Sequence, residues 1–360
     1  MKTFTVTLHH STNYGASLQA YALQQAIQKL GHENTIFEYP YDEKTKLFSG
    51  SLGVIIKRIA YKGLTTLRSR RVKRLKRSFR EFHSNRMKLS RIYTSYEDLK
   101  KDPPQADVYI AGSDQVWNIA SKDEFTWARF LDFGNDIVKR ISYAASIEKL
   151  NYTEDDKAKV RALLSKFSSI SLREDNAAQY IHEITGRNTC RVLDPIFLLN
   201  TDEWGRIAKK PRQSGPYILV YQVLRNEHMQ GVVDEIKKQT GYPVVSICHT
   251  PVRWINSDYT YFDVSPEEFI GFYQNASIVV SASFHGTAFG LLFGKPTYGL
   301  VRKGFGGRIK SILSLFDLGN FCITGEGDLP DPIIDNNKLK TSIDAERNRS
   351  VEYLKKAIDG

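Results

Sequence analysis

Cysteine is scarce in this sequence, and long apolar runs are missing from it. The chain of 360 residues has three cysteines, all far apart: Cys190, Cys248 and Cys322. An odd, dispersed set argues against a disulfide framework and against a cysteine zinc site, and it fits a reducing compartment. No stretch approaches the roughly 18 apolar residues of a membrane span, and the first residues form no signal-peptide block. We therefore expect a cytoplasmic protein.

Metal-ligand patterns and repeats are missing as well. No group of acidic residues or histidines has the spacing of metal ligands, so we expect neither a metal nor a cofactor. No internal repeat or low-complexity block is present. With 41% hydrophobic and 25% charged residues, the chain can bury a full core, which excludes a wholly disordered protein.

Basic residues outnumber acidic residues in the chain, and the whole excess lies in one segment. The chain has 51 Lys and Arg against 40 Asp and Glu, a formal net charge of +11. Residues 57–91 contain 14 basic residues and a single acid, Glu81, so this segment carries +13 and the rest of the chain sums to −2. The protein therefore has one basic segment rather than a basic surface everywhere.

The basic segment has two interpretations that the sequence leaves open. Val72, Leu75, Phe79 and Phe82 recur at spacings of three and four, which places them on one face of a helix. A basic amphipathic helix can lie on anionic lipid, at the inner face of the plasma membrane. Alternatively, the apolar stripe faces the core and the charges form a solvated outer face. Nucleic acid is a less favoured partner, because few aromatics are interleaved and no recognised binding module accompanies the segment.

Strand-like and helix-like segments alternate along the chain, which predicts parallel sheets covered by helices. We expect an α/β protein with two Rossmann-like domains that face each other across a cleft. The N-terminal domain would span 1–208 with a basic helical insert at 54–91, and the C-terminal domain 209–335, beginning at a polar linker. Residues 336–360 would form a final helix that packs back on the N-terminal domain. The expected strands are 4–8, 35–39, 107–111, 140–144, 168–172, 191–193, 217–222, 244–248, 277–281 and 297–300.

Polar motifs of the first half follow predicted strands, where open parallel sheets bind ligands. Asn13-Tyr14-Gly15 permits a tight turn and lets a ligand approach the N–H groups of a helix start, although the same residues suit a plain helix cap. After the strand that ends at Ala111, Asp114, Gln115 and Asn118 offer one acid and two amides. This set suits sugar hydroxyls or proton transfer. The plainer alternative is that Asp114 caps a helix.

Candidate cationic groups come from both halves. Arg173 follows a strand and would point its planar guanidinium into the cleft toward a carboxylate or phosphate, unless it only pairs with a neighbouring acid. His285 lies near a helix start beside the small residues Ser283 and Gly286, and could donate to a phosphate or transfer a proton. A buried structural histidine is the alternative. Arg308 ends a glycine-rich loop that could close over an anion.

Taken in order, these motifs resemble those of the polysaccharide pyruvyl transferase family. The resemblance implies a GT-B-type fold of two domains. It also implies transfer of the enolpyruvyl unit of phosphoenolpyruvate to two hydroxyls of a sugar as a cyclic ketal, with release of phosphate, in capsule or exopolysaccharide synthesis. The matching pieces are Asn13-Tyr14-Gly15-Ala16, Ala111-Gly112-Ser113-Asp114-Gln115-Val116-Trp117-Asn118, Ser142-Tyr143-Ala144-Ala145-Ser146, Ser171-Leu172-Arg173-Glu174, Val192-Leu193-Asp194-Pro195, Ser283-Phe284-His285-Gly286 and Arg308-Ile309.

The resemblance also assigns roles. His285 and Arg173 would bind the donor, His285 also serving as the acid, and Asp114 would be the base for an acceptor hydroxyl. Many relatives carry Arg two positions before the motif histidine, where this chain has Ser283. The missing charge must come from elsewhere, and the candidates are Arg308, Arg302 and Arg253. The further donor-side residues are Ser283, Gly286 and Arg308, and the acceptor-side residues are Asn13, Tyr14, Gly15, Asp114, Gln115 and Asn118.

Two other expectations accompany this assignment. The acceptor sugar would be lipid-linked, which would place the enzyme beside the membrane through residues 57–91. The main alternative is a glycosyltransferase that uses a nucleotide-sugar on the same scaffold. Such an enzyme needs an acid for the ribose in its second half, and Glu267 or Glu268 could serve.

Overall fold

The computed structural model describes residues 1–10, 12–40, 69–120, 122–223, 225–248, 252–301, 306–325 and 328–360. Its N-terminal half is built on a parallel five-stranded sheet in the order β3-β2-β1-β4-β5. A short parallel pair, β6 (Ser171–Leu172) and β7 (Cys190–Arg191), continues from β5 through isolated bridges. The five strands are β1 (Lys2–Val6), β2 (Glu33–Glu38), β3 (Leu89–Ile92), β4 (Val108–Ala111) and β5 (Lys139–Ser142).

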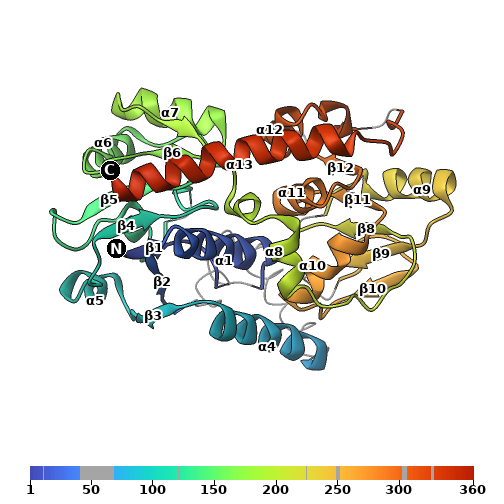
Figure 1. The fold of residues 1–360 in the computed structure, drawn as a ribbon, viewed down its shortest axis with the longest axis horizontal. Coiled ribbons are helices and arrows are strands. Elements are labelled where there is room, and N and C mark those ends of the chain that lie inside the picture. Colours follow the sequence, from blue (N-terminus) through green and yellow to red (C-terminus); the bar gives the residue numbers. More distant parts are fainter. Residues whose placement is uncertain are drawn as a thin grey trace, which may run out of the picture.

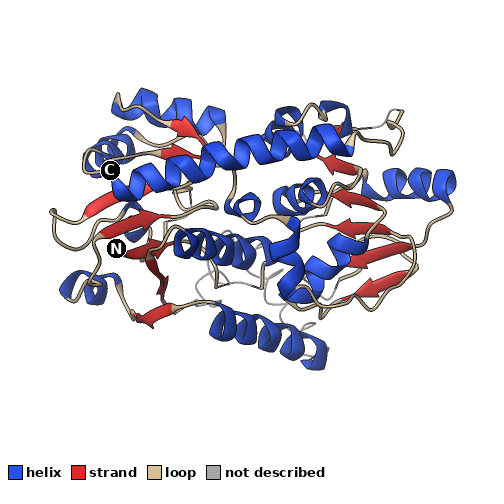
Figure 2. Ribbon diagram, viewed as in Figure 1, coloured by secondary structure: helices blue, strands red, loops and turns tan. Residues whose placement is uncertain are grey.

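The C-terminal half repeats the plan with a parallel six-stranded sheet in the order β10-β9-β8-β11-β12-β13. This is the strand order of a doubly wound nucleotide-binding domain. Figure 2 shows the alternation of strands and helices that produces both sheets. The strands are β8 (Ile218–Tyr221), β9 (Val244–Ile247), β10 (Tyr259–Tyr261), β11 (Ile278–Ser281), β12 (Thr297–Leu300) and β13 (Cys322–Ile323).

Helices cover both sheets, and α1 (Tyr14–Lys29) lies between the two halves (Figure 1). Asn13 starts α1 by accepting hydrogen bonds from the backbone of Gly15 and Ala16. Most of α1 is buried, because it contacts helices of both halves. The other α-helices are α4 (Ser69–Arg86), α5 (Tyr96–Lys101), α6 (Glu154–Leu164), α7 (Asp175–Thr185), α8 (Thr201–Ile207), α9 (Met229–Thr240), α10 (Pro266–Asn275), α11 (Phe284–Leu292), α12 (Gly307–Leu315) and α13 (Asn336–Asp359).

The last helix, α13, crosses from one half of the molecule to the other (Figure 1). Leu339 and Ile343 near its start belong to the core cluster of the C-terminal half. Leu354 and Ile358 near its end belong to a cluster that includes Ile110 of β4. Burial of apolar side chains at both ends of α13 therefore ties the two halves together. No described helix is both long and apolar enough to cross a bilayer.

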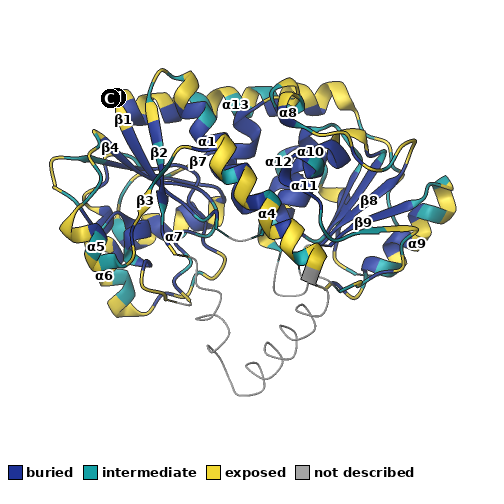
Figure 3. Ribbon diagram, turned by 90° about the horizontal axis from the view of Figure 1, so that it is seen from below, coloured by how far each residue is buried: buried dark blue, intermediate teal, exposed yellow. Residues whose placement is uncertain are grey.

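Helix α4 shows which way the basic segment faces. Leu75, Phe79 and Phe82 are buried in the same core cluster as Tyr14 and Tyr21. The outer side of α4 is exposed (Figure 3) and carries its arginines and lysines. The apolar stripe is thus core-facing rather than a lipid-inserting face. Residues 57–68 of the basic segment lie outside the described residues.

Candidate active site

A cleft of about 470 Å³ opens where the carboxyl ends of the two sheets face each other. Its first wall comes from the segments that follow β1, β2 and β4, and its second from those that follow β8, β11 and β12. This is the edge at which open α/β sheets bind ligands. The lining residues are Leu8, His9, His10, Asn13, Ala16, Tyr39, Asp114, Gln115, Glu148, Val223, Ala282, Ser283, Phe284, His285, Leu300, Val301, Gly306, Arg308 and Ile309.

His285 lies on the second wall and touches the first. It occupies the first turn of α11, which Ser283 caps through a hydrogen bond from the backbone of Gly286. The imidazole fills the space beside Gly15, where an added Cβ would lie 2.2 Å from His285 Nδ1. Gly15 is therefore required for a close approach between the two halves. His285 is 6% exposed, so only an edge of the ring reaches the cleft.

A buried charge network stands behind His285. Asp194 Oδ2 accepts a hydrogen bond from Arg173 Nη1 at 2.7 Å and lies 3.3 Å from His285 Nε2. Arg173 also donates to Glu174 Oε1 at 2.8 Å and to Ser146 Oγ at 3.0 Å. Burial alone would raise the pKa of Asp194, but His285 and Arg173 outweigh it and hold that pKa well below its usual range. Asp194 is thus an anion that orients His285.

Arg173 does not occupy the position that the sequence suggested. Its side chain is 2% exposed, its guanidinium is turned to Asp194 and Glu174, and it is not among the residues that line the cleft. The guanidinium also stacks over the Phe284 ring at 4.1 Å. The expectation that Arg173 projects into the cleft is wrong, because its guanidinium N–H groups donate to the buried carboxylates of Asp194 and Glu174. Arg173 can act on a ligand only through Asp194 and His285.

The motif that follows β4 supplies polar groups to the first wall. Asp114 lines the cleft and has a φ of 66°, a left-handed conformation that concentrates at functional sites in non-glycine residues. Gln115 lines the cleft beside it, and Asn118 donates to Gln115 Oε1 at 2.7 Å. Asn118 is not a lining residue, so it positions Gln115. Trp117 is fully buried, as expected of a core residue.

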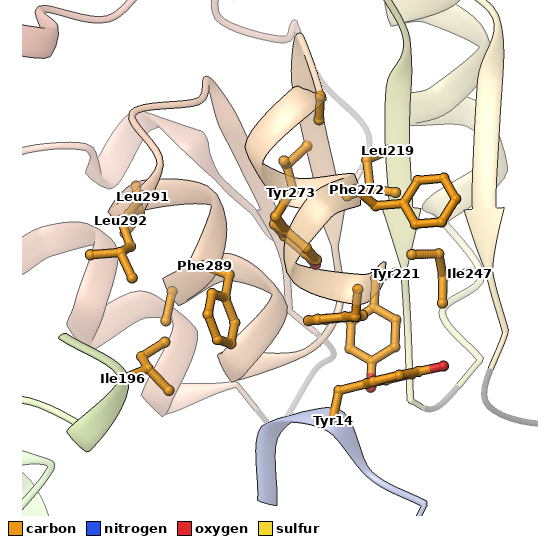
Figure 4. Close-up of a cluster of buried hydrophobic side chains, with 14 of the residues drawn as sticks. Tyr14, Ile196, Leu219, Tyr221, Ile247, Phe272, Tyr273, Phe289, Leu291 and Leu292 are labelled. Atoms are coloured by element: carbon orange, nitrogen blue, oxygen red, sulfur yellow. The ribbon is translucent and has the colours of Figure 1, made fainter. Parts of the chain in front are cut away.

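Two other predicted site residues face the core rather than the cleft. Tyr14 is fully buried, donates a hydrogen bond to the Val264 carbonyl at 2.8 Å, and stacks on Phe269. Figure 4 shows its ring beside Tyr221. Gly286 is a close-contact residue, since an added Cβ would lie 2.2 Å from Ser281 Oγ. Neither residue is among those that line the cleft. The expected acceptor contact of Tyr14 is therefore wrong.

Arg308 brings a cation from the second half to the cleft. Its Nη2 donates to Glu148 Oε1 of the first half at 3.1 Å. Gly306, with a φ of 107°, starts α12, and no described side chain caps that helix. The uncapped N–H groups of α12 therefore lie at the cleft, where they favour an anion. Residues 302–305 of the expected loop, Arg302 among them, lie outside the described residues.

Several polar or aromatic lining residues were not among the predicted site residues: His9, His10, Tyr39 and Glu148. The two histidines follow β1, and both contact Glu38 at the end of β2. Burial, followed by the charge of His9, lowers the pKa of His10 to about 2. The signal that could have found them is the rule used elsewhere, that polar residues at strand ends form the site. His9 and His10 belong to the same strand-end segment as Asn13, and Glu38 and Tyr39 stand at the end of β2.

Two Rossmann-like domains with a cleft at their facing carboxyl edges define a GT-B fold, and comparisons with solved structures agree. A putative UDP-N-acetylglucosamine 2-epimerase from Listeria monocytogenes is similar, with a TM-score of 0.52 at 12% identity over 99% of this chain and 90% of the other. An α-glucosyltransferase in complex with UDP and DNA gives a TM-score of 0.50 at 10% identity over 99% and 95%. At such identities the likeness concerns the fold alone.

The family follows from the sequence itself. The model of the polysaccharide pyruvyl transferase family matches residues 13–304. This range includes most of the cleft residues and the buried network behind His285. The chain belongs to the polysaccharide pyruvyl transferase family. Among curated proteins no match was found.

Proposed function

We propose that this enzyme transfers pyruvate from phosphoenolpyruvate to two hydroxyls of a glycan or lipid-linked sugar, forming a cyclic ketal and releasing phosphate. The observation that carries the proposal is the division of the cleft. The second wall presents His285, Arg308 and the uncapped start of α12, which suit an anion. The first wall presents Asp114 and Gln115, which suit hydroxyls.

The donor has a carboxylate and a phosphate, so it needs at least two cationic or N–H-rich anchors. We assign the phosphate to His285 and the carboxylate end to Arg308 with the N–H groups of α12. These N–H groups replace the arginine that many relatives carry at the position of Ser283. Arg308, which pairs with Glu148 of the first half, would contact the donor in place of that carboxylate.

The reaction requires three events. An acid protonates the methylene carbon of phosphoenolpyruvate, and one acceptor hydroxyl attacks the resulting oxocarbenium-like carbon. Departure of phosphate then lets the second hydroxyl close the ring, with one proton lost from each hydroxyl. We assign His285 as the acid and Asp114 as the base for an acceptor hydroxyl. Arg173 and Asp194 are positioning residues that hold the imidazole in place.

Asp114→Asn is expected to lower the rate of phosphate release by about 100-fold with little change in the KM for phosphoenolpyruvate, because loss of a general base affects the chemical step. The matched control is Asp155→Asn, an exposed acid on α6. Steady-state phosphate release with a saturating acceptor measures both effects. Turnover of Asp114→Asn at the wild-type rate would remove the base assignment.

A thermal-shift assay distinguishes the proposed donor, phosphoenolpyruvate, from the nucleotide-sugar donor of a glycosyltransferase. Phosphoenolpyruvate should raise the midpoint of unfolding in proportion to its occupancy, and UDP-sugars should not. The glycosyltransferase alternative rested on Glu267 or Glu268 as the acid that binds the ribose, and the positions of these two residues do not favour it. Glu267 contacts Lys209, Glu268 contacts Arg212 and caps its own helix, and neither lines the cleft. Stabilisation by UDP-sugars but not by phosphoenolpyruvate would favour the glycosyltransferase.

We further propose that the exposed face of α4 docks the enzyme on an anionic membrane. Lys73, Arg77 and Arg80 all lie on this face. Each basic residue near an anionic surface contributes about 1 kcal/mol, so loss of three such charges costs more than about 100-fold in vesicle binding, and their reversal costs at least as much. Flotation with anionic and neutral vesicles at two salt concentrations measures this.

The control for that experiment reverses three exposed lysines on α13, at Lys338, Lys340 and Lys355. The control should bind anionic vesicles almost as well as the wild type, because it has the same net charge as the α4 variant but an intact basic face. An equal loss of vesicle binding in the α4 and α13 variants would show that binding depends on net charge alone and not on the basic face of α4. Binding of the wild type to neither kind of vesicle would end the membrane proposal.

A further inference from the structure

Two neighbouring strands bring three ligand-type side chains together at the edge of the cleft. His9 and His10 follow β1, and Glu38 ends β2, which pairs with β1 in parallel. The carboxyl ends of the two strands are adjacent, so side chains 29 residues apart in sequence meet. One ligand atom from each of the three residues lies within 4.8 Å of the other two.

The distances in this cluster suit metal ligands as well as ion pairs. His9 Nε2 lies 3.3 Å from Glu38 Oε2, and His10 Nδ1 lies 3.3 Å from Glu38 Oε1. Charge-assisted hydrogen bonds are shorter, at about 2.7–2.9 Å. Ligands about 2.0–2.1 Å from a tetrahedral zinc ion lie roughly 3.3 Å from one another. Each imidazole nitrogen therefore lies at the ligand–ligand spacing of a zinc site from one oxygen of Glu38, His9 from Oε2 and His10 from Oε1.

Among the described residues, ring contacts hold the cluster in place at the edge of the cleft. The His9 and His10 ring centroids are 3.7 Å apart, and His10 packs against Tyr39 at 4.2 Å. Among the described residues, no lysine or arginine forms an ion pair with Glu38, whose side chain is 20% exposed. Within the described part of the chain, the ion-pair partners of this carboxylate are the two histidines. Both histidines line the cleft, so a fourth ligand can enter from there.

We propose that His9, His10 and Glu38 bind a divalent transition metal ion of the zinc class, with its remaining position open to the cleft. Two imidazoles and one carboxylate are a donor set that such ions favour. The open position would accept a hydroxyl or phosphate oxygen of a ligand bound between the two walls. This site is separate from the donor wall of His285 and Arg308, and it does not depend on the proposed reaction.

Metal binding is tested on the full, tag-free chain after dialysis against a chelator. Titration with Co²⁺ should give visible d–d absorption that saturates at one equivalent, and Zn²⁺ should displace it. Glu38→Gln and His10→Gln should each weaken binding by more than about 100-fold, because each removes a direct ligand and changes to outer-shell partners already cost 10–100-fold. His182→Gln, at an exposed histidine on α7, should bind like the wild type.

Circular dichroism and the midpoint of unfolding in metal-free buffer show whether each variant is folded. Absence of saturable Co²⁺ binding in the wild type would overturn the proposal. So would binding that persists in both folded ligand variants or is lost in His182→Gln. If one ligand variant fails to fold, the other decides. Metal binding is measured by absorption and needs no catalytic turnover. Failure of the metal proposal would therefore leave the pyruvyl transfer proposal standing, and failure of pyruvyl transfer would leave the metal proposal standing.

Discussion

His285→Ala is expected to reduce phosphate release from phosphoenolpyruvate plus acceptor by about 10²- to 10⁴-fold, because the side chain is assigned as both phosphate ligand and acid. The fold should survive, since Asp194 retains its hydrogen bond from Arg173. His285→Gln separates the two roles. An amide can still donate to phosphate but cannot transfer a proton, so its KM for the donor should stay near that of the wild type while its kcat falls as far as in His285→Ala.

The control for this series is His182→Ala, an exposed histidine whose Nδ1 contacts only the Arg187 carbonyl. It should retain full activity. Most of the wild-type rate in His285→Ala would show that the imidazole neither binds the phosphate nor moves the proton. A high rate in His285→Gln alone would leave the phosphate contact and remove the acid assignment.

Asp194→Asn is expected to cost about 3–5 kcal/mol of stability, because removal of one member of a buried ion pair leaves an uncompensated charge. The amide can still accept from the Ile196 backbone, but its NH₂ group would face the Arg173 guanidinium. Loss of the oriented imidazole should lower activity as well. Urea unfolding measures the stability change. Asp175→Asn, at a side chain that is 76% exposed, is the control and should be nearly neutral.

The difference in stability between the wild type and Asp194→Asn should depend on pH, because the pKa of Asp194 is low in the folded protein. A carboxyl whose folded-state pKa is depressed stabilises the fold above its unfolded pKa of about 3.9, and this contribution is lost as pH falls toward the folded pKa. The stability gap between wild type and Asp194→Asn should therefore be larger at pH 5 than at pH 3. A gap that widens on acidification would contradict a charged Asp194 in the folded protein.

Much of the fold could be predicted from the sequence, because buried parallel strands are short apolar runs between helices. Each expected strand is present, with ends displaced by a few residues. The missed strands, β3, β10 and β13, lie at the outer part of the sheets. In β3, Arg91 and Ile92 are exposed, so the segment lacks the apolar run of a central strand. The direction of α4 could not be decided either, since a core-facing and a lipid-facing stripe have the same period.

The position of the candidate site could be predicted from the sequence, but the contacts between its side chains could not. Residues that follow strands were correctly expected to gather at one edge, and His285, Asp114 and Arg308 do line one cleft. Which side chain pairs with which is a tertiary fact. Asp194 stands in the sequence only as part of the motif Val192-Leu193-Asp194-Pro195, yet in the structure it contacts both Arg173 and His285. Sequence spacing also could not show that Glu38 meets His9, because strand pairing brings them together.

The most direct test of pyruvyl transfer is phosphate release from phosphoenolpyruvate, measured with galactosyl, glucosyl and N-acetylmannosaminyl acceptors. Pyruvate on the acceptor is followed by mass spectrometry in the same reactions. We predict that at least one acceptor gains a ketal-linked pyruvate, with phosphate released in equal amount, and that His285→Ala abolishes both. Consumption of a UDP-sugar by these acceptors, with phosphoenolpyruvate left intact, would contradict the account.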